Sequence, residues 1–361
     1  MKGTIRFMVY ILAAILVFGV LIAVHELGHF LAAKACGVTV HEFSIGMGPA
    51  LYQKTKGETD YSIRLLPIGG FCAMEGEEEE SDNPHALNNQ SFWRKLLIYA
   101  AGAAMNFVAG LIILLVLFAG AKAFYTAEIT AIDPASDLAA PGGLQVGDEL
   151  LYIDGERVYN QGNISMLLGL NKDGTFDFTV QRNGEKVKIH DFPAATHEFT
   201  DTKGGTYVGY GFTLGAVEEA TFFSKIRYSW NSAMDFVRMV RLSLEMLFTG
   251  EAGVKDLSGP VGIVNTMTEV GQQSATVRDA ISNISYLAAL IAVNLAVMNL
   301  LPIPALDGGK IFFLTINALF LLIFKRQIPA KFENYIHAAG FILLMGLMAV
   351  VMFMDVWKLF Q

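Results

Sequence analysis

The chain has 361 residues, of which 53% are hydrophobic and only 17% are charged. Soluble domains carry about 25% charged residues, so this composition indicates a protein that crosses a membrane several times. The net charge is −8, and much of it lies in the acidic run from Glu75 to Asp82, which speaks against a nucleic-acid ligand and reads as a solvated loop. The two cysteines, Cys36 and Cys72, provide neither a disulfide framework nor a cysteine-based zinc site.

The first long apolar segment runs from about Ile5 to Lys34 and carries the pattern His25-Glu26-Leu27-Gly28-His29 near its end. The uncharged residues 7–24 would cover about 27 Å as a helix, close to the thickness of a bilayer core. We do not interpret this segment as a cleavable signal peptide, because it is too long and its removal would detach the histidine pattern from its helix.

On one helix, His25 and His29 lie one turn apart on the same face, where two imidazoles can bind one Zn²⁺. Glu26 is then placed beside the metal as a general base. Such a cluster is costly inside a membrane span, so the pattern predicts a zinc protease site within the bilayer. The alternative is a helix end whose His and Glu are merely interfacial.

Residues 38–75 alternate polar and apolar side chains with Gly and Pro between them, a pattern typical of short strands in hairpins. Strands at membrane depth must be covered by protein, so we expect a hairpin layer against the helices near the metal. An uncovered strand edge facing the metal would dock an extended substrate. Gly70 and Phe71 are the candidate contacts on that edge.

Three further apolar segments follow, so we expect a polytopic α-helical membrane protein with about four transmembrane helices. The three segments are Leu96 to Gly120, Ile281 to Leu306 and Tyr335 to Met354. The first is expected to lie in a helix of about 93–122 and the last in a helix of about 334–356. The predicted organisation is an N-terminal half of the core (1–125), an inserted soluble domain (126–215), a linking segment (216–280) and a C-terminal half (281–361). Within the linking segment, Phe222 to Leu247 predicts an amphipathic helix, either at the membrane surface or packed on the inserted domain.

Lys and Arg near the segment ends predict the orientation. The first connection carries Lys34, Lys54, Lys56, Arg64, Arg94 and Lys95, and the last carries Lys325, Arg326 and Lys331. Both connections should be cytoplasmic, which puts the inserted domain and both termini outside and the metal toward the cytoplasmic side. Lys2 and Arg6 at the N-terminus oppose this orientation.

Asp307 directly follows the third apolar segment in an otherwise uncharged run, after the helix-breaking Pro302 and Pro304. A lone carboxylate there is costly unless it is paired or binds a metal. A catalytic zinc needs three protein ligands, and His25, His29 and Asp307 complete that set. The alternative is that Asp307 caps a helix that begins at Gly308.

Two amides, Asn294 and Asn299, lie in the same segment and need polar partners. We predict that both contact the substrate backbone or the oxyanion, and hydrogen bonding between helices is the alternative. For Asn106 in the second segment, we favour such an interhelical contact.

Together, HELGH, the hairpin sequences FSIGMGP and GGFCAMEGE, and NLLPIPALDGG resemble the site-2 protease family of intramembrane zinc metalloproteases. The similar branch is the bacterial regulator of sigma-E protease, with four spans and an inserted PDZ domain. The resemblance implies one Zn²⁺ per chain, a place in the bacterial plasma membrane, and cleavage of single-span membrane proteins such as anti-sigma factors or remnant signal peptides. It also implies that Asn299 lies near the catalytic site.

The inserted domain, 126–215, resembles an extracytoplasmic PDZ domain through Gly143 to Val158. That stretch predicts a strand, a turn at Gly147-Asp148, a strand and a turn at Asp154-Gly155, and a hairpin should turn at Asn183-Gly184. The resemblance implies a role as a substrate gate. A domain that binds a peptide or substrate ectodomain and one without a ligand both stay open.

One departure from the family pattern is visible at Gly102-Ala103-Ala104-Met105-Asn106, where relatives usually have Pro after the Gly. We expect it to affect helix shape and not the ligands. Two other functions compete with the protease. One is an inactive membrane-anchored PDZ scaffold with a structural metal site, which would have four protein ligands. The other is a metal transporter, for which the spans hold too few polar residues.

Overall fold

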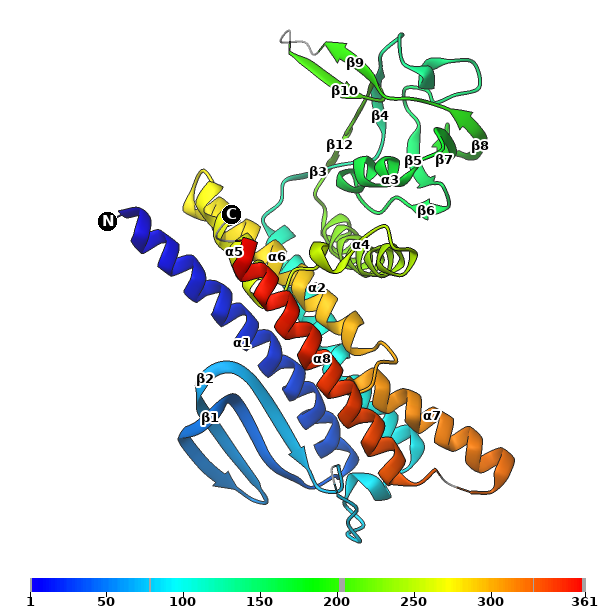
Figure 1. Cartoon of the computed structure of the whole chain (residues 1–361). Coiled ribbons are helices and arrows are strands. Elements are labelled where there is room, and N and C mark those ends of the chain that lie inside the picture. Colours follow the sequence, from blue (N-terminus) through cyan, green and yellow to red (C-terminus); the bar gives the residue numbers. More distant parts are fainter. Residues whose placement is uncertain (1, 78, 201–204, 327, 359–361) are drawn as a thin grey trace. The chain divides into compact units, whose positions relative to one another are not determined.

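The computed structural model describes residues 2–77, 79–200, 205–326 and 328–358 (Figure 1). The chain forms two compact units, one made of Met1–Leu114 and Phe236–Gln361 and the other of Leu115–Asp235. The first unit contains the histidine pattern and Asp307, so it holds the candidate metal site.

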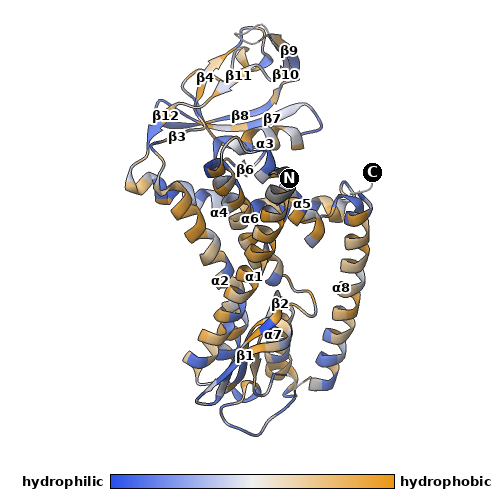
Figure 2. Ribbon diagram, turned by 90° about the vertical axis from the view of Figure 1, so that its left-hand side faces the viewer, coloured by the Kyte–Doolittle hydropathy of each residue, from blue (hydrophilic) through white to orange (hydrophobic). Residues whose placement is uncertain are grey.

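Helices make up most of the first unit. They are α1 (Lys2–Cys36), α2 (Phe92–Ala119), α4 (Phe222–Thr249), α5 (Pro260–Gln273), α6 (Val277–Asn299), α7 (Asp307–Phe324) and α8 (Ala330–Lys358), and α2 and α4 each extend into the second unit. The colouring of Figure 2 shows that α1, α2 and α8 are predominantly hydrophobic. Small residues of α1 and α6, such as Ala14 and Ala292, pack with Leu21 and Met267 in a core in which α5 also takes part.

All four predicted apolar segments contain membrane-length helices, but the third is not continuous. α6 ends at Asn299, a loop covers residues 300–306, and α7 begins at Asp307. Pro302 and Pro304 explain the break, because proline lacks the N–H that a helix needs. Five described helices, with α7 as the additional one, are therefore long and apolar enough to span, and the number that cross stays a prediction.

The predicted hairpin layer consists of two long strands, β1 (Val40–Lys56) and β2 (Thr59–Met74). Both strands bend, so that residues 60–63 pair on one side with 42–45 and on the other with 52–55. Residues 70–74 pair with 40–45 and form an outer segment of the resulting sheet. Buried Val40, Cys72 and Met74 pack against Ala33 of α1 and Ile98 of α2, which fixes the sheet beside the end of α1.

The second unit is rich in short strands. They are β3 (Ala123–Tyr125), β4 (Ile129–Ile132), β5 (Glu149–Ile153), β6 (Glu156–Arg157), β7 (Thr175–Arg182), β8 (Glu185–Pro193), β9 (His197–Thr200), β10 (Thr206–Gly209), β11 (Phe212–Leu214) and β12 (Val217–Glu219), with helix α3 (Ile164–Leu170) between β6 and β7. The order β6-β5-β7-β8 forms a four-stranded sheet, and β11 pairs with β4, β12 with β3, and β10 with β9. Single turns of 3₁₀-helix lie at 87–89, 137–139, 161–163 and 254–256 of the chain.

Local sequence signals explain much of this unit. The β7–β8 hairpin turns at Asn183-Gly184 and β5–β6 at Asp154-Gly155, as predicted, and all four residues have positive φ. The strand predicted before Gly147 is wrong, because residues 143–148 form a loop. Buried Asp148 holds that loop by accepting the Gln145 N–H at 2.8 Å and two Arg182 N–H groups at 2.7 Å.

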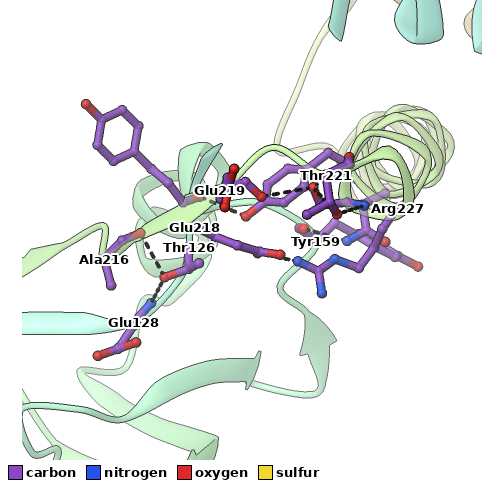
Figure 3. Close-up of polar contacts among 12 residues, drawn as sticks. Thr126, Glu128, Tyr159, Ala216, Glu218, Glu219, Thr221 and Arg227 are labelled. Carbon is purple, nitrogen blue, oxygen red and sulfur yellow. Dashed lines mark hydrogen bonds and ion pairs between the residues drawn. The ribbon is translucent and has the colours of Figure 1, made fainter. Parts of the chain in front are cut away.

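The predicted amphipathic helix is confirmed as α4, and its first half belongs to the second unit. Asn231 donates to the Tyr159 carbonyl at 3.1 Å, and Tyr228 stacks on Phe124. Figure 3 shows Arg227 of α4 paired with Glu218 of β12. The start of α4 is thus packed on the strands, as one of the two predicted placements requires, while a membrane-surface position stays a prediction.

Candidate metal centre

His25, His29 and Asp307 come together in the first unit, as the sequence predicts. The Nε2 atoms of the two histidines are 3.2 Å apart, and Asp307 Oδ2 lies 3.1 Å from His25 Nε2 and 3.2 Å from His29 Nε2. In the described part of the chain, this is the group of His, Cys, Asp and Glu side chains that converges closely enough to hold a metal ion. It joins residues that lie about 280 positions apart in the sequence.

The spacing of these three atoms fits zinc. Ligands that bind Zn²⁺ tetrahedrally at 2.0–2.1 Å lie about 3.3 Å from one another. Asp307 Oδ2 is buried and accepts no hydrogen bond, although both ring nitrogens are close to it. A buried carboxylate oxygen without a hydrogen bond is costly, so a cation shared by the three atoms would satisfy it.

A carbonyl of α2 fixes the chemical form of His29. His29 Nδ1 lies 2.8 Å from the Ile98 carbonyl oxygen, which can only accept a hydrogen bond. Nδ1 therefore carries the proton, and the lone pair of Nε2 points toward His25 and Asp307. This arrangement is typical of metal-binding histidines, whose other ring nitrogen donates to a protein acceptor.

Two glycines let α1 and α2 approach closely at the site. A Cβ on Gly102 would lie 2.3 Å from His29 Nε2 and 2.7 Å from His25 Cε1, and one on Gly28 would lie 2.4 Å from the Ala101 carbonyl oxygen. Any larger residue at Gly102 would occupy the space beside the histidine nitrogens. Gly102 itself therefore bears on the candidate ligands, whereas the expected effect of Ala103, in place of Pro, on the shape of the helix stays a prediction.

The loop before Asp307 aims its carboxylate. Ala305 has a positive φ of 76°, and its N–H donates to His337 Nδ1 at 3.0 Å. A Cβ on Gly308 would lie 2.2 Å from the Leu301 carbonyl oxygen, so only glycine fits against this loop. Asp307 is the first residue of α7, yet none of the described backbone N–H groups donates to its side chain, which speaks against the capping alternative.

A cavity of about 740 Å³ opens beside the three candidate ligands. Glu26, Phe71 and Asn299 line it, and a Cβ on Gly70 would lie 3.4 Å from Glu26 Cγ. Asn294 is exposed and does not line the cavity. The structure thus brings three of the four predicted substrate contacts to the site, and their roles stay predictions.

An ion pair and a thiol complete the cavity wall. Lys310 Nζ of α7 lies 2.6 Å from Glu77 Oε1, just beyond β2, and ties the sheet to the helix that carries Asp307. Burial raises the pKa of the Cys72 thiol to about 12, with Glu26 and Glu77 adding to the shift. Among the described residues, Cys72 does not belong to the group of side chains that converges at the candidate site, which leaves the two histidines and the aspartate.

Sequence reasoning missed Gly102, Lys310 and Glu77 as parts of the site and gave Asn106 another role. A signal was present for two of them, because Gly102 and Asn106 lie four residues apart and so share one face of α2. No pattern in the sequence indicated the Lys310–Glu77 ion pair, since 233 residues separate its members.

Comparison with known proteins identifies the family of this chain. A model of peptidase family M50 matches residues 13–347. The chain belongs to this family, the site-2 proteases. A Clostridium perfringens protein named as a zinc metalloprotease is 38% identical over 96% of this chain and 98% of its own length, and one from Clostridium acetobutylicum is 36% identical over 96% and 97%. The regulator of sigma-W protease RasP of Bacillus subtilis is 28% identical over 97% of this chain and 99% of its own.

This M50 peptidase is therefore a zinc-dependent metalloendopeptidase of the membrane, and the predictions of family, enzyme class and cofactor are confirmed. A polytopic helical protein with some sheet is confirmed as well.

We expect Gly102→Ala to lower the affinity for zinc by at least about tenfold, because the new methyl group would displace the histidine rings. Chelator competition on the purified protein measures this affinity. Gly346→Ala in α8 is the matched control, since a Cβ there meets nothing within 4 Å. Equal zinc affinity of Gly102→Ala and wild type would contradict the close approach described here.

Proposed function

We propose that this M50 peptidase cuts single-span membrane proteins within the bilayer, with His25, His29 and Asp307 as zinc ligands and Glu26 as the general base. The observation that carries the proposal is the convergence of the three ligand atoms inside apolar helices, beside a cavity that Glu26 lines. Bound zinc supplies Lewis acidity toward water and toward the scissile carbonyl. Glu26 accepts the proton of the attacking water and passes it to the leaving amine.

Asn299 ends α6 at the cavity wall, where its amide is suited to hold the substrate backbone or the developing oxyanion. Asn294 lies exposed on another face of α6, outside the cavity lining, and is proposed to contact the substrate helix. A substrate helix must unwind before its backbone reaches this cavity, because a helical backbone has its carbonyls hydrogen-bonded internally.

The outer segment of the sheet supports a docking site for that unwound chain. Residues 71–74 line the cavity, and of the described strands β1 alone pairs with this segment. An extended substrate that adds a strand along 70–74 would run past His25 and Glu26. Phe71 and Gly70 are the proposed contacts, and Gly70 lets the strand lie close to Glu26, since a Cβ there would lie 2.9 Å from the Ser44 carbonyl oxygen and 3.4 Å from Glu26 Cγ.

Anti-sigma factors and remnant signal peptides are the proposed substrate classes. The name of the Bacillus subtilis relative, regulator of sigma-W protease, supports the first class. A scaffold with a structural metal site is not favoured, because such sites have four protein ligands and the described residues supply three.

For the β-rich second unit, we propose that residues 126–215 form an extracytoplasmic PDZ domain that screens substrates by their ectodomains. The confirmed turns at Asp154-Gly155 and Asn183-Gly184 support this. Titration of the full chain with a substrate ectodomain would show binding if the screening is direct.

We further propose four crossings in a bacterial plasma membrane, with the metal toward the cytoplasmic side. In this proposal α7 is the helix that does not cross. Its first residue, Asp307, contacts His25 and His29 of α1, so α7 begins inside the membrane at the depth of these histidines.

We expect Glu26→Gln to reduce cleavage of a single-span model substrate by about 10²-fold or more while the zinc content is unchanged, because the amide cannot accept a proton. Cleavage and zinc are both measured on the purified protein. Glu58→Gln, at an exposed turn of the sheet, is the matched control. Cleavage by Glu26→Gln at the wild-type rate would exclude Glu26 as the base.

Truncation of Phe71 to Ala should raise KM severalfold and leave kcat nearly unchanged, because Phe71 lines the cavity without holding the metal or a proton. Steady-state cleavage of the same substrate gives both constants. Tyr52→Ala, on the part of β1 that does not face residues 70–74, should change neither. A fall in kcat alone would argue against docking along this segment.

Single cysteines in a variant without Cys36 and Cys72 would test the crossings. With an impermeant thiol reagent on intact cells, we expect Asn183→Cys to react, and Lys56→Cys and Arg326→Cys to react only after permeabilisation. Reaction of Arg326→Cys in intact cells would mean that α7 crosses as a fifth span.

A further inference from the structure

Asn106 of α2 is a buried amide that faces the candidate ligand His25. Asn106 is only 1% exposed, and its Nδ2 lies 3.4 Å from His25 Nδ1. Its Oδ1 is buried without a hydrogen-bond partner. An amide in an apolar helix is costly unless it is used, so this contact calls for a reason.

The reason follows from the way a histidine binds a metal. His25 presents Nε2 to His29 and Asp307, so zinc binding needs the lone pair on Nε2 and the proton on Nδ1. An Nδ1–H group needs an acceptor, and Nδ2 of Asn106 is a donor. The oxygen and nitrogen of an amide occupy nearly the same space, so a half-turn of the Asn106 amide places Oδ1 against His25 Nδ1–H.

We propose that Asn106 is a positioning residue whose side-chain oxygen accepts the Nδ1–H of His25 and holds the imidazole in the form that binds zinc. The inference rests on the proposed ligand set. With this role for Asn106, three residues on one face of α2 contribute to the candidate metal site. The Ile98 carbonyl oxygen orients His29, Gly102 leaves space beside both rings, and Asn106 orients His25. These residues are spaced four apart and therefore line up along the helix.

The test is the zinc affinity of the purified full chain, measured by chelator competition. We expect Asn106→Leu to raise the zinc dissociation constant about 10- to 100-fold, as for other residues that orient metal-binding histidines. Asn106→Ala, which removes the amide without adding bulk, should behave in the same way. Asn106→Asp keeps an acceptor oxygen and should stay within about threefold of wild type.

Asn283→Leu is the matched control, because it removes an amide of α6 that bonds to Ser274 Oγ at 3.1 Å and should leave zinc affinity unchanged. The visible spectrum of the Co²⁺-substituted protein gives a second readout, since a misoriented His25 alters the ligand field. Asp has nearly the shape of Asn, so an altered Co²⁺ ligand field in Asn106→Leu and Asn106→Ala, restored in Asn106→Asp, identifies the acceptor oxygen as the orienting group.

Two outcomes would overturn the proposal: wild-type zinc affinity in both Asn106→Leu and Asn106→Ala, or an affinity of Asn106→Asp as weak as theirs. Asp307→Ala separates this failure from that of the ligand assignment. If Asp307→Ala loses zinc while the Asn106 variants keep it, only the role of Asn106 falls. If Asp307→Ala keeps wild-type affinity, the ligand set itself is wrong.

Discussion

The cost of placing charge and unpaired polar atoms among apolar helices governs this protein. Two imidazoles and a carboxylate meet within 3.2 Å, and the carboxylate oxygen has no hydrogen-bond donor of its own. Water would relieve that cost in a soluble protein, but a membrane helix has only its neighbours and a bound cation to do so. The convergence of the three candidate ligands, the close approach of α1 and α2 and the break before Asp307 all provide polar partners for these buried groups.

The surrounding parts can be understood from it. Gly28 and Gly102 bring α1 and α2 close enough for a backbone carbonyl to reach His29. The turn of chain from Leu300 to Leu306 gives up helical hydrogen bonds so that Asp307 points at the histidines, and His337 accepts the Ala305 N–H that this turn leaves free. The sheet made by β1 and β2 covers the end of α1 and leaves its outer segment, 70–74, along the cavity.

Local patterns predicted the elements well, because their physical causes are local. Uncharged runs of bilayer length became α1, α2, α6 and α8, and Asn-Gly and Asp-Gly pairs became tight turns. Errors arose where a distant part of the chain decides the outcome. Residues 143–146 look like a strand, but buried Asp148 and Arg182 hold the adjoining segment as a loop. α7 was not counted among the apolar segments and appeared only as the helix that Asp307 caps in the alternative interpretation, since its apolar character alone cannot tell a crossing helix from one that starts at the site.

By itself, the sequence determined the family and predicted the candidate ligands and their order, because HELGH and LDG carry their chemistry in a few adjacent residues. Only the tertiary structure decided what surrounds the ligands. Lys310 and Glu77 meet across 233 residues, and Asn106 faces His25 because α1 and α2 cross at two glycines. An apolar helix has no polar face that would show which side is buried against another helix, so its sequence cannot indicate which amide reaches a candidate ligand.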